Sequence, residues 1–426
     1  MDLTQILNEP KLKPKKMKYF QYFLIACCAL LPWNATAVNQ GSLSQKIFTK
    51  KLGRDLIESL LVKSLLEITQ GNNKQAMSTV NELIRTAPNF KLAYLIRGDL
   101  ISAQGAALEA FGNANSATSS GRSGHDEIEG LRDEARTRIE HYFSEDKNHL
   151  VPNLLVELDA NQQHLIVVDT VKSRLFLYKK SDAGLQYVAD YYVTIGKNGA
   201  DKQVQGDKRT PLGLYFASKK MAGPLEDFYG DGAYPLNYPN ELDKYQSKTG
   251  SGIWLHGTPH DTYSRPPRAS DGCVVLSNPD LNTLKPILDA GNTPVVISNK
   301  IDWVENQSAS QNTQKILAKA ILDWRADWVA QNTDAYLNHY SKTFFYSDGG
   351  LKAWSDHKRN IQANKPKVTI NIGDISMFSY PSAKLPTVVV NFTQDFKSAT
   401  LQNKMRKRQY WQQEGNEWKI IYEGAV

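Results

Sequence analysis

Cysteine is scarce in this chain of 426 residues, which has three of them. Cys27 and Cys28 lie in an apolar run close to the N-terminus, and Cys273 lies far from both. If the N-terminal run is an export signal and is removed, the mature protein keeps one thiol, which excludes a fold held by internal disulfides. In an oxidising compartment a lone thiol is either buried as a small apolar side chain or used for chemistry.

Other common signatures are missing as well. The apolar run at residues 23–31 is too short to span a bilayer as a helix, which needs about 20 apolar residues. His125, His141 and His149 are too scattered for a metal site, because no two-histidine spacing with a third ligand occurs. No glycine-rich loop of the phosphate-binding kind is present. We therefore expect neither a metal nor a cofactor.

The N-terminus has the order of parts typical of an export signal. Five lysines between residues 11 and 18 precede the apolar run, and Ala35-Thr36-Ala37 supplies a small-residue cleavage pattern. We expect residues 1–37 to be a signal peptide and the protein to be periplasmic or cell-envelope, in a bacterium. A lipobox ending at Cys27 is the alternative. Cleavage lowers the net charge from +7 to +4, which is too mild a bias to indicate nucleic acid.

Residues 38–148 are expected to form a helical domain. Apolar residues recur at three- and four-residue spacing over 55–68, 76–84 and 93–105, and a charged helix is expected over 127–143. The stretch 114–126 is small and polar, which predicts a loop. One helix–turn–helix unit resembles a tetratricopeptide repeat, so protein partners are the expected role of this domain.

The rest of the chain predicts two further domains in a multidomain α+β protein. Residues 150–300 alternate β-branched and aromatic residues and are rich in glycine and proline, which indicates a β-rich domain. Residues 312–426 begin with a long helix bearing Trp324 and Trp328 and end in three strand candidates, with a hairpin turn at Gly415. Helices followed by antiparallel strands indicate an α+β domain.

Cys273 stands in a segment suited to nucleophilic catalysis. His256 ends an apolar strand, and Ser270-Asp271-Gly272-Cys273 leads into a second apolar run. Cysteine acyl transfer needs a thiolate, a base that generates it and donors that hold the oxyanion. Gly272 permits a tight turn that brings N–H groups together. His256 could instead be a hydrogen-bonded strand-end histidine, and His260 is a rival base.

This segment resembles the catalytic signature of the L,D-transpeptidase (YkuD) family, in which a His-Gly pair precedes Ser-x-Gly-Cys. Sixteen residues separate His256 from Cys273, the sequence TPLGLYF at 210–216 is similar to the family's strand entrance, and residues 233–240 resemble a further segment. The resemblance implies that Cys273 attacks a carbonyl of a peptidoglycan stem peptide and that His256 is the base. It also implies that the carbonyl of Gly257 orients His256, with oxyanion donors at Gly272 and Cys273.

Two positions depart from the usual transpeptidase pattern, since Asp271 stands where the family often has His, and Val275 where it often has Arg or Asn. They resemble the branch of cell-shape-determining L,D-carboxypeptidases, which carry a C-terminal NTF2-like cone similar to residues 312–426. The resemblance implies trimming of tetrapeptide to tripeptide. A transpeptidase that forms 3-3 cross-links or attaches or detaches proteins is the alternative, and a non-catalytic wall-binding scaffold is a second.

Five polar residues near the motif are candidates for holding the substrate. An arginine fork can grip a terminal carboxylate, which makes Arg265 and Arg268 candidates, although a solvated loop explains them equally well. Ser270, Arg209 and Tyr234 are further candidates for the walls of the cleft.

Overall fold

The computed structural model describes residues 56–105, 111–112, 122–144, 150–182, 184–305, 308–363, 367–381 and 383–426. The chain divides into two compact units, Met1–Ser144 with His260–Pro267, and Glu145–Pro259 with Arg268–Val426. The expected signal peptide and the lipobox cysteine lie outside the described residues. Across the described residues, no helix is both long and apolar enough to cross a bilayer.

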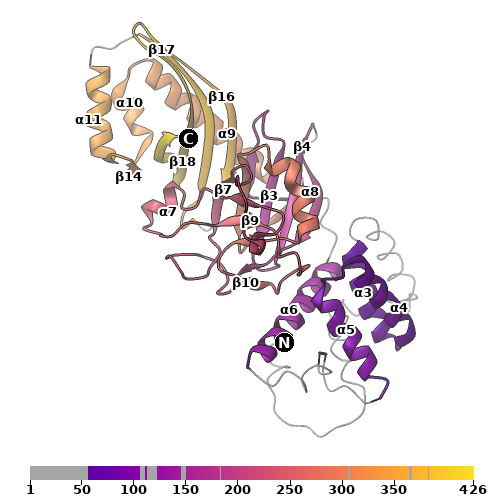
Figure 1. Cartoon of the computed structure of the whole chain (residues 1–426). Coiled ribbons are helices and arrows are strands. Elements are labelled where there is room, and N and C mark those ends of the chain that lie inside the picture. Colours follow the sequence, from indigo (N-terminus) through magenta and orange to yellow (C-terminus); the bar gives the residue numbers. More distant parts are fainter. Residues whose placement is uncertain are drawn as a thin grey trace. The chain divides into compact units, whose positions relative to one another are not determined.

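The first unit is helical, as its apolar spacing predicts. Its helices are α3 (Leu56–Thr69), α4 (Asn73–Thr86), α5 (Lys91–Ser102) and α6 (Arg122–Phe143) (Figure 1). Leu61, Leu83 and Ile96 are fully buried in a shared core. α6 begins inside the stretch predicted to be a loop, so that prediction is wrong for residues 122–126, because polar residues lower helix propensity without excluding helix. The repeat-like character of the unit stays a prediction.

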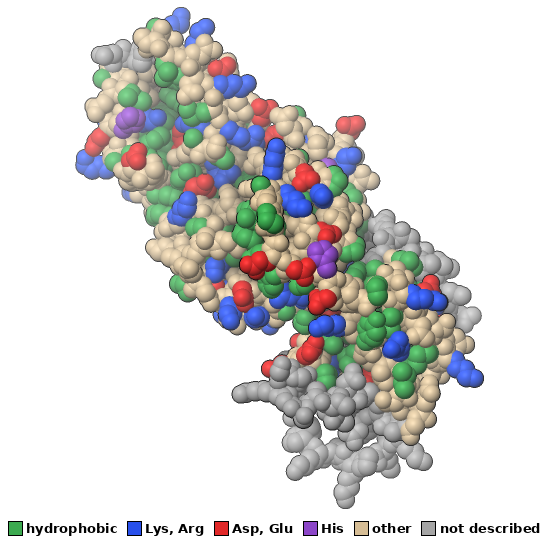
Figure 2. Space-filling view, viewed as in Figure 1, with side chains coloured by type: hydrophobic (Ala, Val, Ile, Leu, Met, Phe, Trp, Pro, Cys, Tyr) green, Lys and Arg blue, Asp and Glu red, His purple; other side chains and the backbone are tan. Residues whose placement is uncertain are grey.

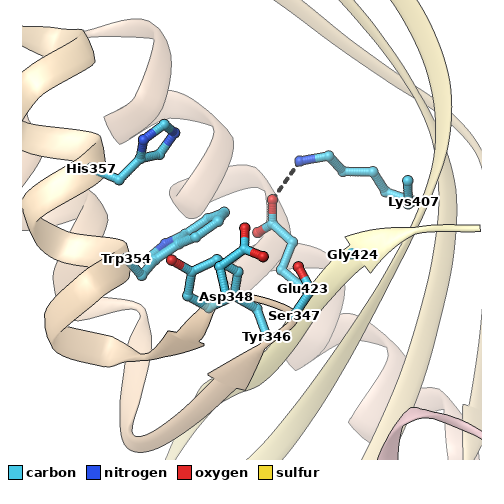
Figure 3. A pocket seen from close by; sticks show the side chains of 9 residues that line it. Tyr346, Ser347, Asp348, Trp354, His357, Lys407, Glu423 and Gly424 are labelled. Atoms are coloured by element: carbon cyan, nitrogen blue, oxygen red, sulfur yellow. Dashed lines mark hydrogen bonds and ion pairs between the residues drawn. The ribbon is translucent and has the colours of Figure 1, made fainter.

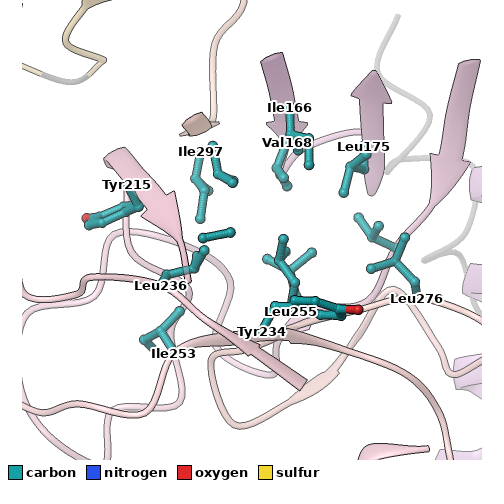
Figure 4. Packing of buried hydrophobic residues seen from close by; sticks show 14 of the residues in the cluster. Ile166, Val168, Leu175, Tyr215, Tyr234, Leu236, Ile253, Leu255, Leu276 and Ile297 are labelled. Atoms are coloured by element: carbon teal, nitrogen blue, oxygen red, sulfur yellow. The ribbon is translucent and has the colours of Figure 1, made fainter. Parts of the chain in front are cut away.

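The second unit contains a five-stranded sheet with the order β5-β4-β3-β12-β7. Its strands are β3 (His164–Asp169), β4 (Arg174–Ser181), β5 (Gly184–Tyr192), β7 (Gly213–Ala217) and β12 (Thr293–Ser298). β12 runs parallel to β3 and antiparallel to β7. Ile166 and Val168 face one core (Figure 4). Leu165 and Val167 face another. Both faces are thus covered, which explains the continuous apolar runs.

Smaller elements surround this sheet. A three-stranded sheet has the order β11-β9-β8, and two further strand pairs are β10 with β6 and β1 with β13. These strands are β1 (Leu150–Pro152), β6 (Ile195–Gly196), β8 (Ala233–Pro235), β9 (Trp254–His256), β10 (Arg268–Ser270), β11 (Val274–Val275) and β13 (Trp303–Glu305). The accompanying helices are η2 (Asp227–Tyr229), α7 (Glu241–Tyr245) and α8 (Asn278–Leu288). Leu255 of β9 and Val274 of β11 pack into the same core as Ile166, so the small sheet is anchored on the large one.

The C-terminal part combines three helices with a curved seven-stranded sheet of order β15-β14-β19-β18-β17-β16-β2. Its elements are α9 (Ser308–Val329), α10 (Thr333–Asn338), α11 (Leu351–Gln362), β2 (Leu155–Glu157), β14 (Tyr340–Tyr346), β15 (Gly349–Gly350), β16 (Val368–Ser379), β17 (Thr387–Ser398), β18 (Gln402–Glu414) and β19 (Glu417–Ala425). Figure 1 shows the helices against the long strands. Gly415 has φ +62° between β18 and β19, which confirms the hairpin turn. Trp324 and Trp328 are buried in this core.

The central and C-terminal parts of the second unit share a packed seam. The rings of Phe216 and Phe378 lie 6.3 Å apart, and the Glu241 carboxylate accepts a hydrogen bond from the Tyr410 hydroxyl at 2.9 Å. Burial alone would raise the pKa of Glu241, but the charge of Arg408 and the hydrogen bonds outweigh it and lower that pKa. β2 links the two parts as well, because it precedes the five-stranded sheet in the chain but pairs with β16 of the C-terminal sheet.

Candidate active site

His256 is the last residue of β9, and its side chain is fully buried. Its Nδ1 lies 2.7 Å from the carbonyl oxygen of Gly257. Because a carbonyl oxygen can only accept, Nδ1 carries the proton of the neutral imidazole and the lone pair is at Nε2. The contact expected between His256 and Gly257 is therefore present, and it leaves Nε2 able to accept a proton.

Cys273 lies one residue before β11, which runs parallel to β9 with Val275 opposite His256. The Leu276 N–H donates to the His256 carbonyl at 2.9 Å, which continues the pairing. Neighbouring strands lie about 4.8 Å apart, so the pairing brings the end of β9 at His256 next to the short strand that directly follows Cys273, although 16 residues separate His256 from Cys273 in the sequence. The Cys273 thiol is half-buried, and its Sγ donates to the Gly252 carbonyl at 3.4 Å.

Aromatic side chains border both residues. The ring of Tyr229 lies 5.2 Å from the His256 imidazole and 4.9 Å from Trp254, and Phe228 lies 5.8 Å from His256. Burial raises the pKa of Tyr229, and the charge of Cys273 raises it further. His256 and Cys273 thus lie beside one tyrosine. Phe228 and Tyr229 leave no signal in the sequence, because residues 227–229 form a single short turn without periodicity.

The turn before Cys273 is held by Ser270. Its buried hydroxyl donates to the Cys273 carbonyl at 2.6 Å and accepts from the Gly272 N–H at 3.1 Å. These contacts differ from the two that were expected: the Ser270 hydroxyl, expected at the substrate, organises the turn, and the Gly272 N–H, expected at the oxyanion, donates to Ser270. Gly272 has φ +127°, and a Cβ there would lie 2.8 Å from the Arg209 carbonyl oxygen, so the turn requires glycine.

Thr210 fixes the same turn from a distant part of the chain. Its hydroxyl donates to the Gly272 carbonyl at 2.9 Å and accepts from the Gly196 N–H at 2.9 Å, and the side chain is fully buried. Thr210 opens the TPLGLYF segment that the sequence singled out as a strand entrance. Its link to Gly272 spans 62 residues and has no local signal.

Replacing Thr210 by valine is expected to loosen this turn. The change leaves a buried N–H and a buried carbonyl without their partner, so the free energy of unfolding should fall by about 1–3 kcal/mol. Alkylation of Cys273 by a soluble electrophile should slow as its backbone loses its support. Denaturant unfolding and peptide-resolved alkylation measure the two effects. Thr210→Ser keeps the hydroxyl and should stay near wild type, and equal behaviour of the two variants would contradict this role.

Asn278, the first residue of α8, bonds to the residues around Gly257. The Asn278 side chain accepts from the Asp231 N–H at 3.0 Å and donates to the Thr258 carbonyl at 2.9 Å. A Cβ at Gly257 would lie 2.1 Å from Asn278 Oδ1, so this position requires a glycine. Asn278 therefore supports the peptide that orients His256. The sequence does not indicate this role of Asn278, since asparagines are common where helices begin.

Three arginines are expected near the substrate, Arg265 and Arg268 to hold a carboxylate and Arg209 in a wall of the cleft. Arg268 is exposed at the start of β10, and Arg209 is also exposed and donates to the Ala200 carbonyl at 3.1 Å. Arg265 belongs to the compact helical unit. Lys197 forms a 3.2 Å ion pair with Asp271, which is 67% exposed beside Cys273. Arg268, Lys197 and Asp271 are thus the charged groups associated with the strands and turn leading to Cys273.

Tyr234 has a structural position instead of the expected place in a cleft wall. Its side chain is 1% exposed and lies in the core together with Leu255 (Figure 4). Its hydroxyl donates to the Asp289 carboxylate at 3.0 Å, and burial together with this bond raises the pKa of Tyr234. The expectation is wrong because β8 directs this side chain inward, and a short strand gives no sequence signal for which face is buried.

Among the residues that the structure describes, no group of three or more His, Cys, Asp or Glu is placed to hold a metal ion. His260, the rival base, belongs to the helical unit. Figure 2 shows Lys and Arg side chains interspersed with Asp and Glu on the viewed face.

The C-terminal part has a polar pocket of its own, of about 320 Å³. Glu423 forms a 2.5 Å ion pair with Lys407 in it, and Trp354 and Tyr346 line it (Figure 3). Lys358 lies 4.1 Å from the centre of the Trp354 ring, and burial and then Lys407 lower the pKa of Lys358 to about 8. The residues that line this pocket include one lysine, Lys407, two carboxylates, Asp348 and Glu423, and two aromatic rings, whereas Lys358 lies over the Trp354 ring and is not part of the lining.

Comparison with known proteins distinguishes the central part of the chain from the C-terminal part. Residues 163–297 match the family model of the L,D-transpeptidase (YkuD) catalytic domain, and residues 316–424 match that of the Cds6 C-terminal NTF2-like domain. His256 and Cys273 both lie inside the first match. Among curated proteins, none matches this chain.

Two solved structures resemble the chain over most of their own length. Bd1075 of Bdellovibrio bacteriovorus is 27% identical with a TM-score of 0.56, and the match covers 65% of this chain and 98% of that one. The helical cell shape determining protein Pgp2 of Campylobacter jejuni is 24% identical with a TM-score of 0.55, and the match covers 66% and 96%. About a third of this chain therefore lies outside either match.

Proposed function

We propose that this chain, which carries an L,D-transpeptidase catalytic domain at residues 163–297 and an NTF2-like domain at 316–424, is a cysteine L,D-carboxypeptidase that trims peptidoglycan stem tetrapeptides to tripeptides. The observation that carries the proposal is the parallel pairing of β9, which ends at His256, with β11, which begins directly after Cys273, together with Tyr229, whose ring neighbours His256 and whose pKa is raised by the charge of Cys273. The family match supports the substrate class.

The chemistry follows from the protonation of His256. Its Nε2 takes the proton of the Cys273 thiol, and the thiolate attacks the carbonyl carbon of the third stem residue. The peptide bond to the fourth residue breaks, the imidazolium gives its proton to the leaving amine, and a thioester remains. His256 then takes a proton from water, the hydroxide attacks the thioester, and the thiol is restored as the tripeptide carboxylate leaves. The Cys273 N–H is the proposed donor to the oxyanion.

Water is favoured over an amine as the acceptor because of two residues near the nucleophile. Val275 is 2% exposed, so it offers no polar group to an incoming amine where transpeptidases often carry Arg or Asn. Asp271 is exposed and already paired with Lys197. Water needs no binding site of its own, so a carboxypeptidase loses nothing by these changes.

Purified wall fragments incubated with the whole protein test the proposal. Mass analysis should show tripeptides appearing from tetrapeptides, with one terminal residue released per tripeptide formed. Dimers joined between third residues would instead assign a transpeptidase, and release of an attached protein a detaching enzyme. If no product forms at any enzyme concentration, the scaffold alternative replaces the proposal.

A peptidoglycan substrate also requires an exported enzyme. The signal expected at residues 1–37 would supply export, and an envelope location is therefore part of the proposal. Detection of the mature N-terminus in an envelope fraction would test it.

A further inference from the structure

Eight residues between His256 and Cys273 belong to the helical unit of the molecule. Residues His260–Pro267 form one compact unit with Met1–Ser144, whereas the residues on either side, Pro259 and Arg268, belong to the other unit. The chain thus leaves the catalytic domain three residues after His256 and returns five residues before Cys273. Hydrogen bonds and ring packing hold this segment within the helical unit.

Tyr263 is the main anchor of this segment. Its side chain is 7% exposed and is part of the apolar core of the helical unit, with its ring centre 4.8 Å from that of Phe90. The Tyr263 N–H donates to the Asn89 carbonyl at 3.0 Å, and the Asn89 side chain donates to the His260 carbonyl at 3.0 Å. The backbone and the side chain of Tyr263 are therefore both held by residues of the turn between α4 and α5.

Ser264 makes a second attachment, to a buried charge network. Its hydroxyl donates to the Glu134 carboxylate at 2.6 Å, and that carboxylate also pairs with Arg138 at 3.0 Å. Arg138 in turn pairs with Glu58 of α3 at 2.5 Å, and all three ionisable side chains are buried. Buried charges of this kind are costly unless they are hydrogen-bonded, so the bond from Ser264 to Glu134 ties the segment to a network that joins three helical-unit residues.

The helical-unit residues that contact the segment 260–267 form its seat, and they include Gly130 of α6. A Cβ at Gly130 of α6 would lie 2.7 Å from the Pro266 ring, so α6 approaches the segment as closely as only glycine permits. Contacts from the α4–α5 turn and from α6 thus surround residues 260–267 on the helical side. Loop tips exposed to solvent lack such contacts, and this one is built into a core.

We propose that the helical unit is a positioning module for the active site and that Tyr263 and Ser264 are the positioning residues through which it acts. The segment they hold runs directly into β10 and the Ser270 turn, so holding it restricts where Arg268 and that turn can lie relative to the substrate. This rests on the proposed function and extends it to substrate binding. The pair of His256 and Cys273 is held separately, by the β9–β11 pairing and Thr210.

Tyr263→Ala in the full chain tests the proposal. The KM for a stem tetrapeptide should rise about tenfold while kcat changes much less, because a displaced binding element weakens substrate positioning. Amide hydrogen exchange of residues 268–273 should speed up about tenfold or more. Tyr263→Phe retains the ring and should restore both values.

Leu83→Ala is the matched control, because Leu83 is fully buried in the same helical core and makes a comparable cavity without being part of the seat. It should lower the thermal stability and leave both KM and the exchange at 268–273 unchanged. The proposal is overturned if Leu83→Ala reproduces the effects of Tyr263→Ala, or if Tyr263→Ala leaves the exchange unchanged. Exchange needs no turnover, so it decides the matter even if the carboxypeptidase assignment fails.

Discussion

Cys273→Ala is expected to abolish tetrapeptide trimming, with kcat reduced by at least about 10³-fold. No other described residue can form the thioester in its place, because Cys273 is the only cysteine among the residues that the structure describes. Tripeptide formation from wall fragments, followed by mass analysis, measures the loss. The denaturation midpoint should hardly move, since the Cys273 side chain is small and half-buried, and its hydrogen bond to the Gly252 carbonyl at 3.4 Å is weak.

The control for this variant comes from the other two cysteines. A chain with both Cys27 and Cys28 replaced by alanine should retain wild-type turnover and carry label only at Cys273. Trapping with a thiol-reactive substrate analogue should then give one acyl group per chain. Equal product from Cys273→Ala and wild type would exclude the thioester mechanism, whatever the product.

His256→Gln should produce the second-largest loss, of about 10²–10⁴-fold in kcat, the usual contribution of a general base. Glutamine keeps a hydrogen-bonding side chain next to the Gly257 carbonyl but cannot accept a proton at neutral pH. Alkylation of Cys273 at neutral pH should slow in parallel, because its thiolate is no longer formed by the imidazole. Stopped-flow alkylation and the trimming assay give the two rates.

Two other histidines make this test specific. His164→Gln, on β3, is the matched control and should leave both rates unchanged. His260→Gln examines the rival base. If His260→Gln abolishes alkylation and His256→Gln does not, the base has been assigned to the wrong residue.

The sequence was most informative where neighbours along the chain decide the structure. The order of helices and strands followed from apolar spacing, and the motif that led to the prediction of His256, Gly257 and Cys273 begins on β9 and ends just before β11, two strands that pair. Ser270 was assigned to the substrate because its motif position shows nothing of its hydrogen bonds within the turn. The prediction that Tyr234 lines the cleft was wrong for a related reason, since the sequence of a three-residue strand does not show which of its faces is buried.

Residues whose contacts join distant segments could not be predicted from the sequence. Thr210 bonds to Gly272 across 62 positions, and Ser264 bonds to Glu134 across 130. Such pairs leave no periodic trace, because each partner is an ordinary residue in its own neighbourhood. The loop at residues 260–267 illustrates the difficulty, since its prolines and arginines are typical of a solvated connection, whereas Tyr263 is buried in the helical core.

The strand β2 has a consequence for how the protein is made. Residues 155–157 pair with β16, which begins at residue 368, so more than 200 residues must be synthesised before β2 finds its neighbour. The chain emerges from the ribosome in order and contacts between distant segments form late. The catalytic strands can assemble earlier, but their junction with the last sheet has to wait for the C-terminus. A chain arrested before residue 368 would expose an unpaired edge to aggregation and proteases, which makes prompt completion of translation part of this protein's route to its native state.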